Sequence, residues 1–199
     1  MAQRSKREAI LQVAGDLFVA HGFSKVSIDQ IAAAVPISKP TLYAHFKDKR
    51  ALYGAVIESR CRRNLSELTA MVEETRPVEE ALFAVGYQFL TMVLGTSAMQ
   101  MHRTLTAEVA EFPEIGRLFY HSGPEQLHRF LADYLARMHT ARVLNVADPA
   151  LSADMFLGMM KGNMHLQCLL AVRKPPTKAQ MRARVAYALS LFLAAHRVG

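Results

Sequence analysis

Two helix-start signals lie close together between Ser27 and Phe46, and they constrain the fold more than any other feature of the sequence. Ser27 is followed three residues later by Gln30, and such a pair caps a helix by reciprocal hydrogen bonds to orphan backbone donors. Ser38 can cap a second short segment, and Pro40 falls in its first turn, where a missing N–H does no harm. Two short helices joined by a tight turn match a helix-turn-helix.

The remainder of the chain also indicates helices. In the first segment, apolar residues recur at the i, i+3, i+4, i+7 spacing of one helix face, and Gly22 stands where a left-handed cap would end it. A second capping box, Thr177 with Gln180, opens the last helix, while Asp148 and Pro149 open the one before it. No strand-like alternation of useful length appears. We therefore expect an all-α fold of about nine helices.

The sequence predicts two domains. The helix that starts at an Asp48 cap carries an apolar stripe, Leu52 to Leu68, which is too long to pack on the first three helices alone. We expect a helix-turn-helix domain over residues 1–48 and a larger helical domain over 49–199, with a helix over 49–74 as the connector.

Charge distinguishes the two parts. Residues 1–63 contain 11 Lys and Arg against 5 Asp and Glu, a net charge of +6, whereas residues 64–199 contain 13 against 12, a net charge of +1. A basic excess flanking short helices favours nucleic acid as the partner over a membrane surface.

The third helix is the predicted reader of DNA. Leu42 and Phe46, at i and i+4, should face inward, which leaves polar side chains such as Lys39 and Tyr43 for a major groove. The helix amino terminus adds free N–H groups and the positive end of the helix dipole, both suited to phosphate.

The segment "SIDQIAAAVPISKPTLYAHFKDKRALYGAVI", residues 27–57, resembles the DNA-binding signature of the TetR family of bacterial transcriptional regulators. Residues 103–124, "RTLTAEVAEFPEIGRLFYHSGP", also resemble the carboxy-terminal domain of the AefR-like branch. The resemblance implies a two-fold dimer whose recognition helices enter successive major grooves, about 34 Å apart on B-DNA.

The resemblance also implies roles for individual residues. Those expected to touch phosphates are Ser27, Thr41, Tyr43 and Lys49, and those expected nearest the base edges are Ser38, Lys39, Pro40 and His45. The chain departs from the family at Pro36 and Pro40, where the family often has Gly. Proline cannot take the positive φ that Gly supplies in such a turn, so the turn and the groove-facing surface are expected to differ.

The second domain is rich in methionine, whose flexible thioether suits an adaptable apolar cavity, although core packing is the alternative for each one. Polar residues inside apolar helices could orient a small molecule there, or could be satisfied core contacts. The candidate effector-binding residues are Phe89, Met99, His102, Arg103, Met160, Asn163 and Met164.

The last two long helices, residues 148–172 and 177–197, are expected to form the dimer interface, as the resemblance implies. Their apolar residues exceed what one core requires, and a stable pair typically buries about 1,600 Å². The candidate interface residues are Phe156, Met159, Leu166, Leu170, Val185, Leu189, Phe192 and His196.

Several classes of protein are disfavoured. The longest apolar runs fall short of a membrane span, and Glu8 and Asp16 interrupt the amino-terminal stretch where a signal peptide would be uniformly apolar, so a cytoplasmic location is expected. Cys61 and Cys168 have neither disulfide nor zinc spacing, and no metal or cofactor is expected.

These observations lead to one reading and two rivals. The chain is predicted to be a ligand-responsive DNA-binding regulator, a repressor that a small hydrophobic or amphipathic effector releases from its operator. An architectural or partner-recruiting DNA binder without an effector is the alternative. An enzyme is disfavoured because the sequence has no phosphate loop, no H-E-x-x-H and no nucleophile elbow.

Overall fold

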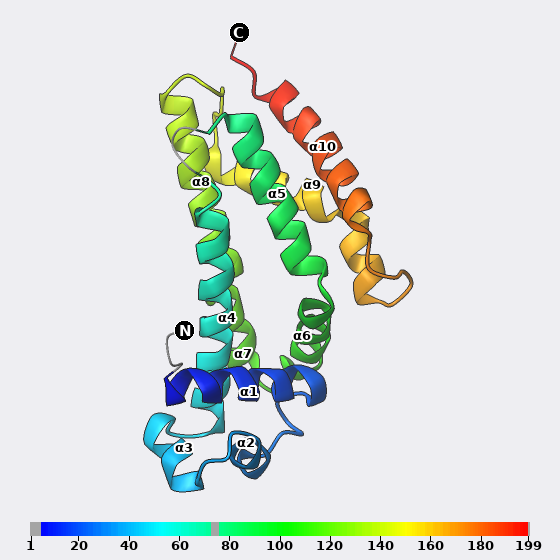
Figure 1. Cartoon of the computed structure of the whole chain (residues 1–199). Helices are drawn as coiled ribbons and strands as arrows, with labels where there is room; N and C mark the ends of the chain where they lie inside the picture. The colour runs from blue at the N-terminus through cyan, green and yellow to red at the C-terminus, as the bar shows by residue number, and fades with distance from the viewer. Residues whose placement is uncertain (1–4, 73–75, 199) are drawn as a thin grey trace. The chain divides into compact units, whose positions relative to one another are not determined.

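The computed structural model describes residues 5–72 and 76–198, and every regular element within them is a helix (Figure 1). The helices are α1 (Lys6–His21), α2 (Ile28–Ala34), α3 (Lys39–His45), α4 (Lys49–Thr69), α5 (Val78–Leu94), α6 (Thr96–Glu108), α7 (Pro113–Ser122), α8 (Pro124–Thr140), α9 (Pro149–Leu169) and α10 (Lys178–Ala195). The all-α prediction is confirmed, with ten helices in the described residues against about nine expected.

The chain divides into two compact units. Unit 1 contains Met1–Arg63 and Gln100–Gly123, and unit 2 contains Asn64–Met99 and Pro124–Gly199. The first unit is thus larger than the expected 1–48 domain and is assembled from two separate stretches of sequence. α4, predicted as a connector over 49–74, ends at Thr69 and contributes to both units; residues 73 and 74 of that prediction lie outside the described residues.

The core of unit 1 is built around aromatic rings. Phe18 of α1 meets Tyr53 of α4 edge to face, with ring centroids 4.8 Å apart, and Phe23 lies 4.9 Å from Tyr53. Phe112, which precedes α7, packs edge to face on Phe23 at 5.5 Å. Leu42 of α3 is completely buried against this core. Residues from both stretches therefore share one core that fixes the position of α2 and α3.

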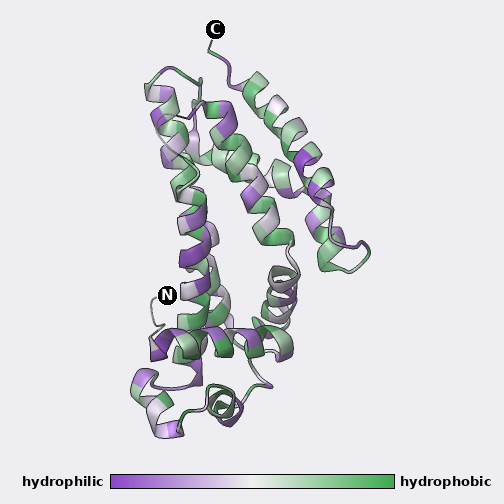
Figure 2. Cartoon of the chain, in the orientation of Figure 1, coloured by the Kyte–Doolittle hydropathy of each residue, from purple (hydrophilic) through white to green (hydrophobic). Residues whose placement is uncertain are grey.

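In unit 2, α8 packs on α9, and α10 packs on α5 and α9. Its core contains the ring pair Phe156 and Phe192, with centroids 5.1 Å apart, and the fully buried Val85, Leu90 and Leu131. Figure 2 shows apolar residues distributed along the length of α10, where Val185 and Leu189 are buried in the core and Tyr187 and Leu191 are exposed.

The predicted caps are present. Ser27 and Gln30 form a full capping box on α2, and Thr177 and Gln180 form one on α10. Asp48 accepts a hydrogen bond from the Ala51 N–H at 2.7 Å at the start of α4. These contacts satisfy backbone donors that a helix start would otherwise leave unpaired.

The turn between α2 and α3 differs from the expectation that Pro36 could not take a positive φ. Pro36 has φ 26°, and the Ile37 N–H donates to the Ala32 carbonyl at 3.0 Å, as in the Schellman ending of a helix. Proline has no N–H for the second bond of that motif, and its ring favours φ near −65°. The turn is therefore kept at the cost of local strain.

α9 is kinked at Gly162, where φ is 45° and ψ is −153°. The kink leaves carbonyl groups of the preceding turn without helical N–H donors, and the side chain of Arg184 in α10 donates to them instead. Its guanidinium donates to the Met159 carbonyl and, at 3.4 Å, to the Met160 carbonyl. A Cβ at position 162 would collide with Nη2 of Arg184, so this position requires Gly for its φ and for its lack of a side chain.

Within the described part of the chain, no single helix has both the length and the apolar character of a membrane span. α5 and α6 meet that test only when they are taken together as a bent pair.

Candidate nucleic-acid interface

α3 presents a polar surface opposite a buried apolar one. Leu42 and Phe46 are 0% and 4% exposed, as predicted, and pack into the core of unit 1. The predicted contact residues of α3 and its cap lie on the surface instead: Ser38, Lys39, Pro40, Tyr43 and His45 are exposed and Thr41 is half-buried. Ser27, the cap of α2, is also exposed. One short helix thus offers hydroxyl, ammonium, phenol and imidazole groups to a partner.

The amino terminus of α3 is organised by Ser38. Its Oγ accepts from the Thr41 backbone N–H at 3.3 Å and lies 2.8 Å from Thr41 Oγ1. The two hydroxyl groups are therefore held together at the helix start, where free N–H groups attract phosphate.

Lys39 is engaged by a residue that the sequence did not single out. Its Nζ lies 2.6 Å from Oδ1 of Asp29, in the first turn of α2. The hydrogen bond and the charge of Asp29 raise the pKa of Lys39. Both side chains are more than half exposed, so water weakens the pair and a nucleic acid could compete for the ammonium.

Lys49 is less available than the sequence suggested. Its Nζ donates to the Ser24 carbonyl at 3.3 Å and lies 4.4 Å from the centroid of the Phe23 ring. Burial lowers the pKa of Lys49, and the nearby Glu108 carboxylate opposes that shift. A phosphate contact by Lys49 would have to compete with these partners.

Arg7 is a further basic residue close to α3. Its guanidinium lies 5.3 Å from the centroid of Phe46, the residue that ends α3. The charge count of residues 1–63 includes Arg7, but only the fold places it next to α3.

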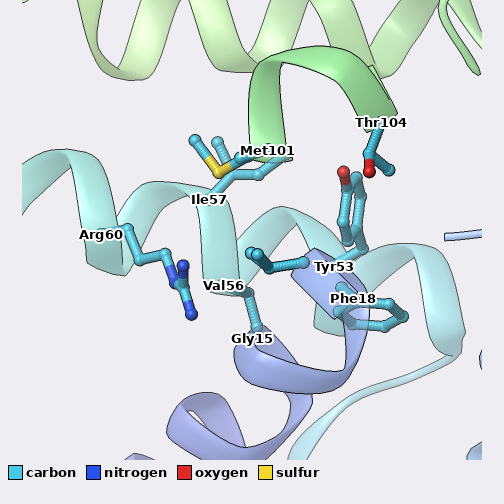
Figure 3. Close-up of a pocket in the computed structure, with 9 residues that line it drawn as sticks. Gly15, Phe18, Tyr53, Val56, Ile57, Arg60, Met101 and Thr104 are labelled. Atoms are coloured by element: carbon cyan, nitrogen blue, oxygen red, sulfur yellow. The ribbon is translucent and has the colours of Figure 1, made fainter. Parts of the chain in front are cut away.

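A small pocket opens in unit 1 between α1, α4 and α6, and Figure 3 shows its lining. The Arg60 side chain lies against Gly15, where an added Cβ would be 2.9 Å from Nη2 of Arg60. The same guanidinium donates a hydrogen bond to Asp16 Oδ1 at 2.9 Å. No predicted effector residue lines this pocket.

The predicted effector residues are divided between the units. His102 and Arg103 belong to unit 1, where the His102 ring packs edge to face on Phe119 with centroids 5.6 Å apart. Phe89, Met99 and Met160 are buried in the core of unit 2, with Met164 packed partly against it. Arg103 and Asn163 are exposed. The seven residues therefore do not belong to one compact unit.

The predicted interface residues also differ in burial. Phe156, Val185, Leu189 and Phe192 are at most 3% exposed and form the core of unit 2. This corrects the expectation for these four, because they have no surface left to offer a second chain. Met159 is half-buried, and His196 is held by Ser152 at 3.1 Å and by the Phe192 carbonyl at 2.8 Å.

Leu166 and Leu170 are 51% and 63% exposed, as an interface requires. α9 and α10 carry further exposed apolar residues that the sequence did not single out, namely Leu151, Met155, Tyr187 and Leu191. Tyr187 and Leu191 are four residues apart and so share one face of α10.

Among the described residues, no group of three or more His, Cys, Asp or Glu side chains gathers as metal ligands would.

Comparison with known proteins agrees with this geometry. Residues 80–198 match the family of AefR-like transcriptional repressor carboxy-terminal domains, and residues 10–56 match the bacterial regulatory proteins of the tetR family. The transcriptional repressor BdcR of Escherichia coli is 25% identical over 149 residues, which are 73% of this chain and 74% of that protein.

Solved structures share the whole fold. A TetR-family regulator from Mesorhizobium loti superposes with a TM-score of 0.88 at 23% identity and covers 97% of each chain. The flavonoid-responsive regulator FrrA has a TM-score of 0.78 at 32% identity, over 96% of this chain and 97% of that one. The chain belongs to the TetR family of bacterial transcriptional regulators, with an AefR-like carboxy-terminal domain.

Proposed function

We propose that this protein is a homodimeric repressor that binds operator DNA through α3 and is released by a small amphipathic effector. The observation that carries the proposal is the polar surface of α3, which lies opposite the buried Leu42 and Phe46. A helix so arranged can enter a major groove while its other side stays anchored in the core. Because its DNA partner lies in the bacterial cytoplasm, we propose that the protein acts there.

The residues of the proposed DNA surface have different tasks. Ser27, Thr41, Tyr43 and Lys49 are proposed to contact phosphates, and Ser38, Lys39, Pro40 and His45 to lie nearest the bases. Phosphate contacts supply affinity for any sequence, whereas base contacts supply preference. For Lys39 to reach a base edge, its ammonium must exchange Asp29 for the DNA.

Two lysine variants test this division. Lys49→Ala should weaken binding to random DNA as well as to operator, because a lost cation removes affinity for every sequence. Lys39→Ala should also reduce the ratio of operator affinity to random-DNA affinity. If Lys39 makes a specific base contact, the reduction is equivalent to about 1–3 kcal/mol of binding free energy. Fluorescence anisotropy on both DNAs at several salt concentrations gives each value. Equal effects of Lys39→Ala on both DNAs would remove it from the base readers.

The dimer is proposed to form through the exposed apolar residues of α9 and α10. Leu151, Met155, Leu166, Leu170, Tyr187 and Leu191 are each 48% exposed or more. Exposed apolar side chains on two helices in contact are typical of an interface between subunits. A second copy of the chain, with the same faces, would bury it symmetrically.

The effector is proposed to bind in unit 2, where Phe89, Met99, Met160 and Met164 can adapt to an apolar body. Asn163, which belongs to the same unit, is proposed to orient its polar groups. FrrA, which shares the fold over nearly its whole length, responds to flavonoids. We therefore propose planar hydroxylated aromatic compounds as the first effector class.

A titration tests the effector directly. Adding a flavonoid to the preformed complex should lower operator affinity by about 5–150-fold, the range of a coupling energy of 1–3 kcal/mol. If no hydrophobic or amphipathic compound changes operator affinity, the protein is an architectural or partner-recruiting DNA binder instead.

A further inference from the structure

The backbone of Ser24 is held from both sides by residues of other helices. Its N–H donates to Glu108 Oε1 at 3.0 Å, and its carbonyl accepts from Lys49 Nζ at 3.3 Å. Glu108 is the last residue of α6, and Lys49 is the first residue of α4. Ser24 stands between α1 and α2, three residues before the Ser27 cap. Two charged side chains thus fix the backbone just ahead of the helix-turn-helix.

The Glu108 carboxylate is built into this position. Its second oxygen, Oε2, is buried and accepts no hydrogen bond from any described residue. Gly22, with φ 90°, makes room for it, since an added Cβ would lie 3.2 Å from Oε1. A buried carboxylate oxygen without a donor is costly, so its position calls for an explanation beyond packing.

The charge of Glu108 acts on the groups around it. It raises the pKa of Lys49 against the lowering caused by burial, so it favours the charged ammonium that binds Ser24. It also adds to burial in raising the pKa of Tyr53 to about 12, which keeps that phenol neutral. The carboxylate therefore supports Lys49 electrostatically and also accepts the hydrogen bond from the Ser24 N–H.

We propose that Glu108 is a positioning residue for operator recognition: together with Lys49 it clamps the Ser24 backbone and so sets where α2, and with it α3, stands in unit 1. The inference rests on the proposed DNA-binding function, and it assigns a role in that function to a residue 84 positions from Ser24. Glu108 itself touches no DNA in this role.

The sign of a charge-removing substitution separates positioning from plain electrostatics. Glu108→Gln keeps the length of the side chain but loses the charge and puts an amide in place of the carboxylate. Glu111→Gln removes the same charge three residues later, at an exposed side chain, and is the matched control. Removing a negative charge near DNA should by itself leave binding unchanged or strengthen it.

We expect Glu108→Gln to lower operator affinity about tenfold, equivalent to the ~1.4 kcal/mol of a weakened charge-assisted hydrogen bond. Affinity for random DNA should not fall, so the ratio of operator affinity to random-DNA affinity should decrease. Partial unfolding would instead lower both affinities together. Glu111→Gln should leave the ratio unchanged. An operator-to-random ratio for Glu108→Gln equal to that of Glu111→Gln overturns the proposal.

Amide exchange in the unmodified protein tests the clamp without any variant. The Ser24 amide should exchange with solvent at least about tenfold more slowly than that of Lys25, for which the described chain shows no acceptor. Equal exchange at the two sites refutes the clamp. If the wild-type protein shows no preferred DNA at all, the proposed function fails, while the exchange result still decides whether the clamp exists.

Discussion

Units 1 and 2 differ in how far their functional surfaces can be recognised from residue types. On α3 of unit 1, every polar side chain named as a DNA contact is at least partly exposed, because burial of an unpaired polar group is costly. On α10 of unit 2, Leu189 is 3% exposed and Leu191, two residues later, is 48% exposed. An apolar side chain tolerates either place. The exposure of polar residues can thus be predicted from residue type, whereas the exposure of apolar residues cannot when a helix has apolar residues on more than one face.

The strongest test of this difference places a charge on each of the two leucines. Leu189→Asp should unfold the protein, because an unpaired charge in the core costs about 3–5 kcal/mol or more. Leu191→Asp should keep its helix content and become a monomer, because the charge lies only in the proposed interface. Circular dichroism and sedimentation velocity distinguish the two. A Leu191→Asp protein that remains dimeric removes this face of α10 from the interface.

A smaller effect is expected where unit 2 departs from a regular helix. Gly162→Ala should lower the free energy of unfolding by about 2–4 kcal/mol, since it strains a positive φ and displaces Arg184 from two carbonyls. Gly158→Ala, four residues earlier on α9 with open space around it, should raise that free energy by about 0.5–1 kcal/mol. Urea unfolding measures both values. Stabilisation by both substitutions would mean that α9 is not kinked.

The smallest effect concerns the turn of unit 1. Pro36→Gly should raise the free energy of unfolding by about 1 kcal/mol, because relief of strain and a new N–H donor outweigh the added freedom of the unfolded chain. Pro40→Gly is the control, since Pro40 stands in the first turn of α3 and Gly there should destabilise by about 0.5–1 kcal/mol. Chemical unfolding measures both values. A free energy of unfolding for Pro36→Gly that is lower than that of the wild type would contradict the strain at this turn.

The sequence predicted those parts of the fold that depend on local chemistry. The caps at Ser27, Ser38 and Thr177 were recognisable because each satisfies its own helix within three residues. The inward pair Leu42 and Phe46 followed from helical spacing alone.

Features that join distant residues were not predictable. Nothing local pairs Lys39 with Asp29, or Glu108 with the Ser24 N–H, because each contact exists only once separate helices have packed. Helix endings without Gly were equally hidden: Pro36, Arg142 and Ala171 take positive φ values with no glycine to signal them. The same limit explains why the sequence did not join residues 100–123 to the core of unit 1.

Selection of bound fragments from a random pool of duplex DNA, using the purified protein, tests the account most directly. Two copies of α3 held by one dimer should enrich an inverted repeat whose half-sites are centred about one helical turn, 10–10.5 base pairs, apart. Leu191→Asp, as a monomer, should lose most of that enrichment. Recovery of no preferred sequence, or of a single unpaired half-site bound equally well by wild type and Leu191→Asp, would contradict the proposal of a dimer that reads DNA through α3.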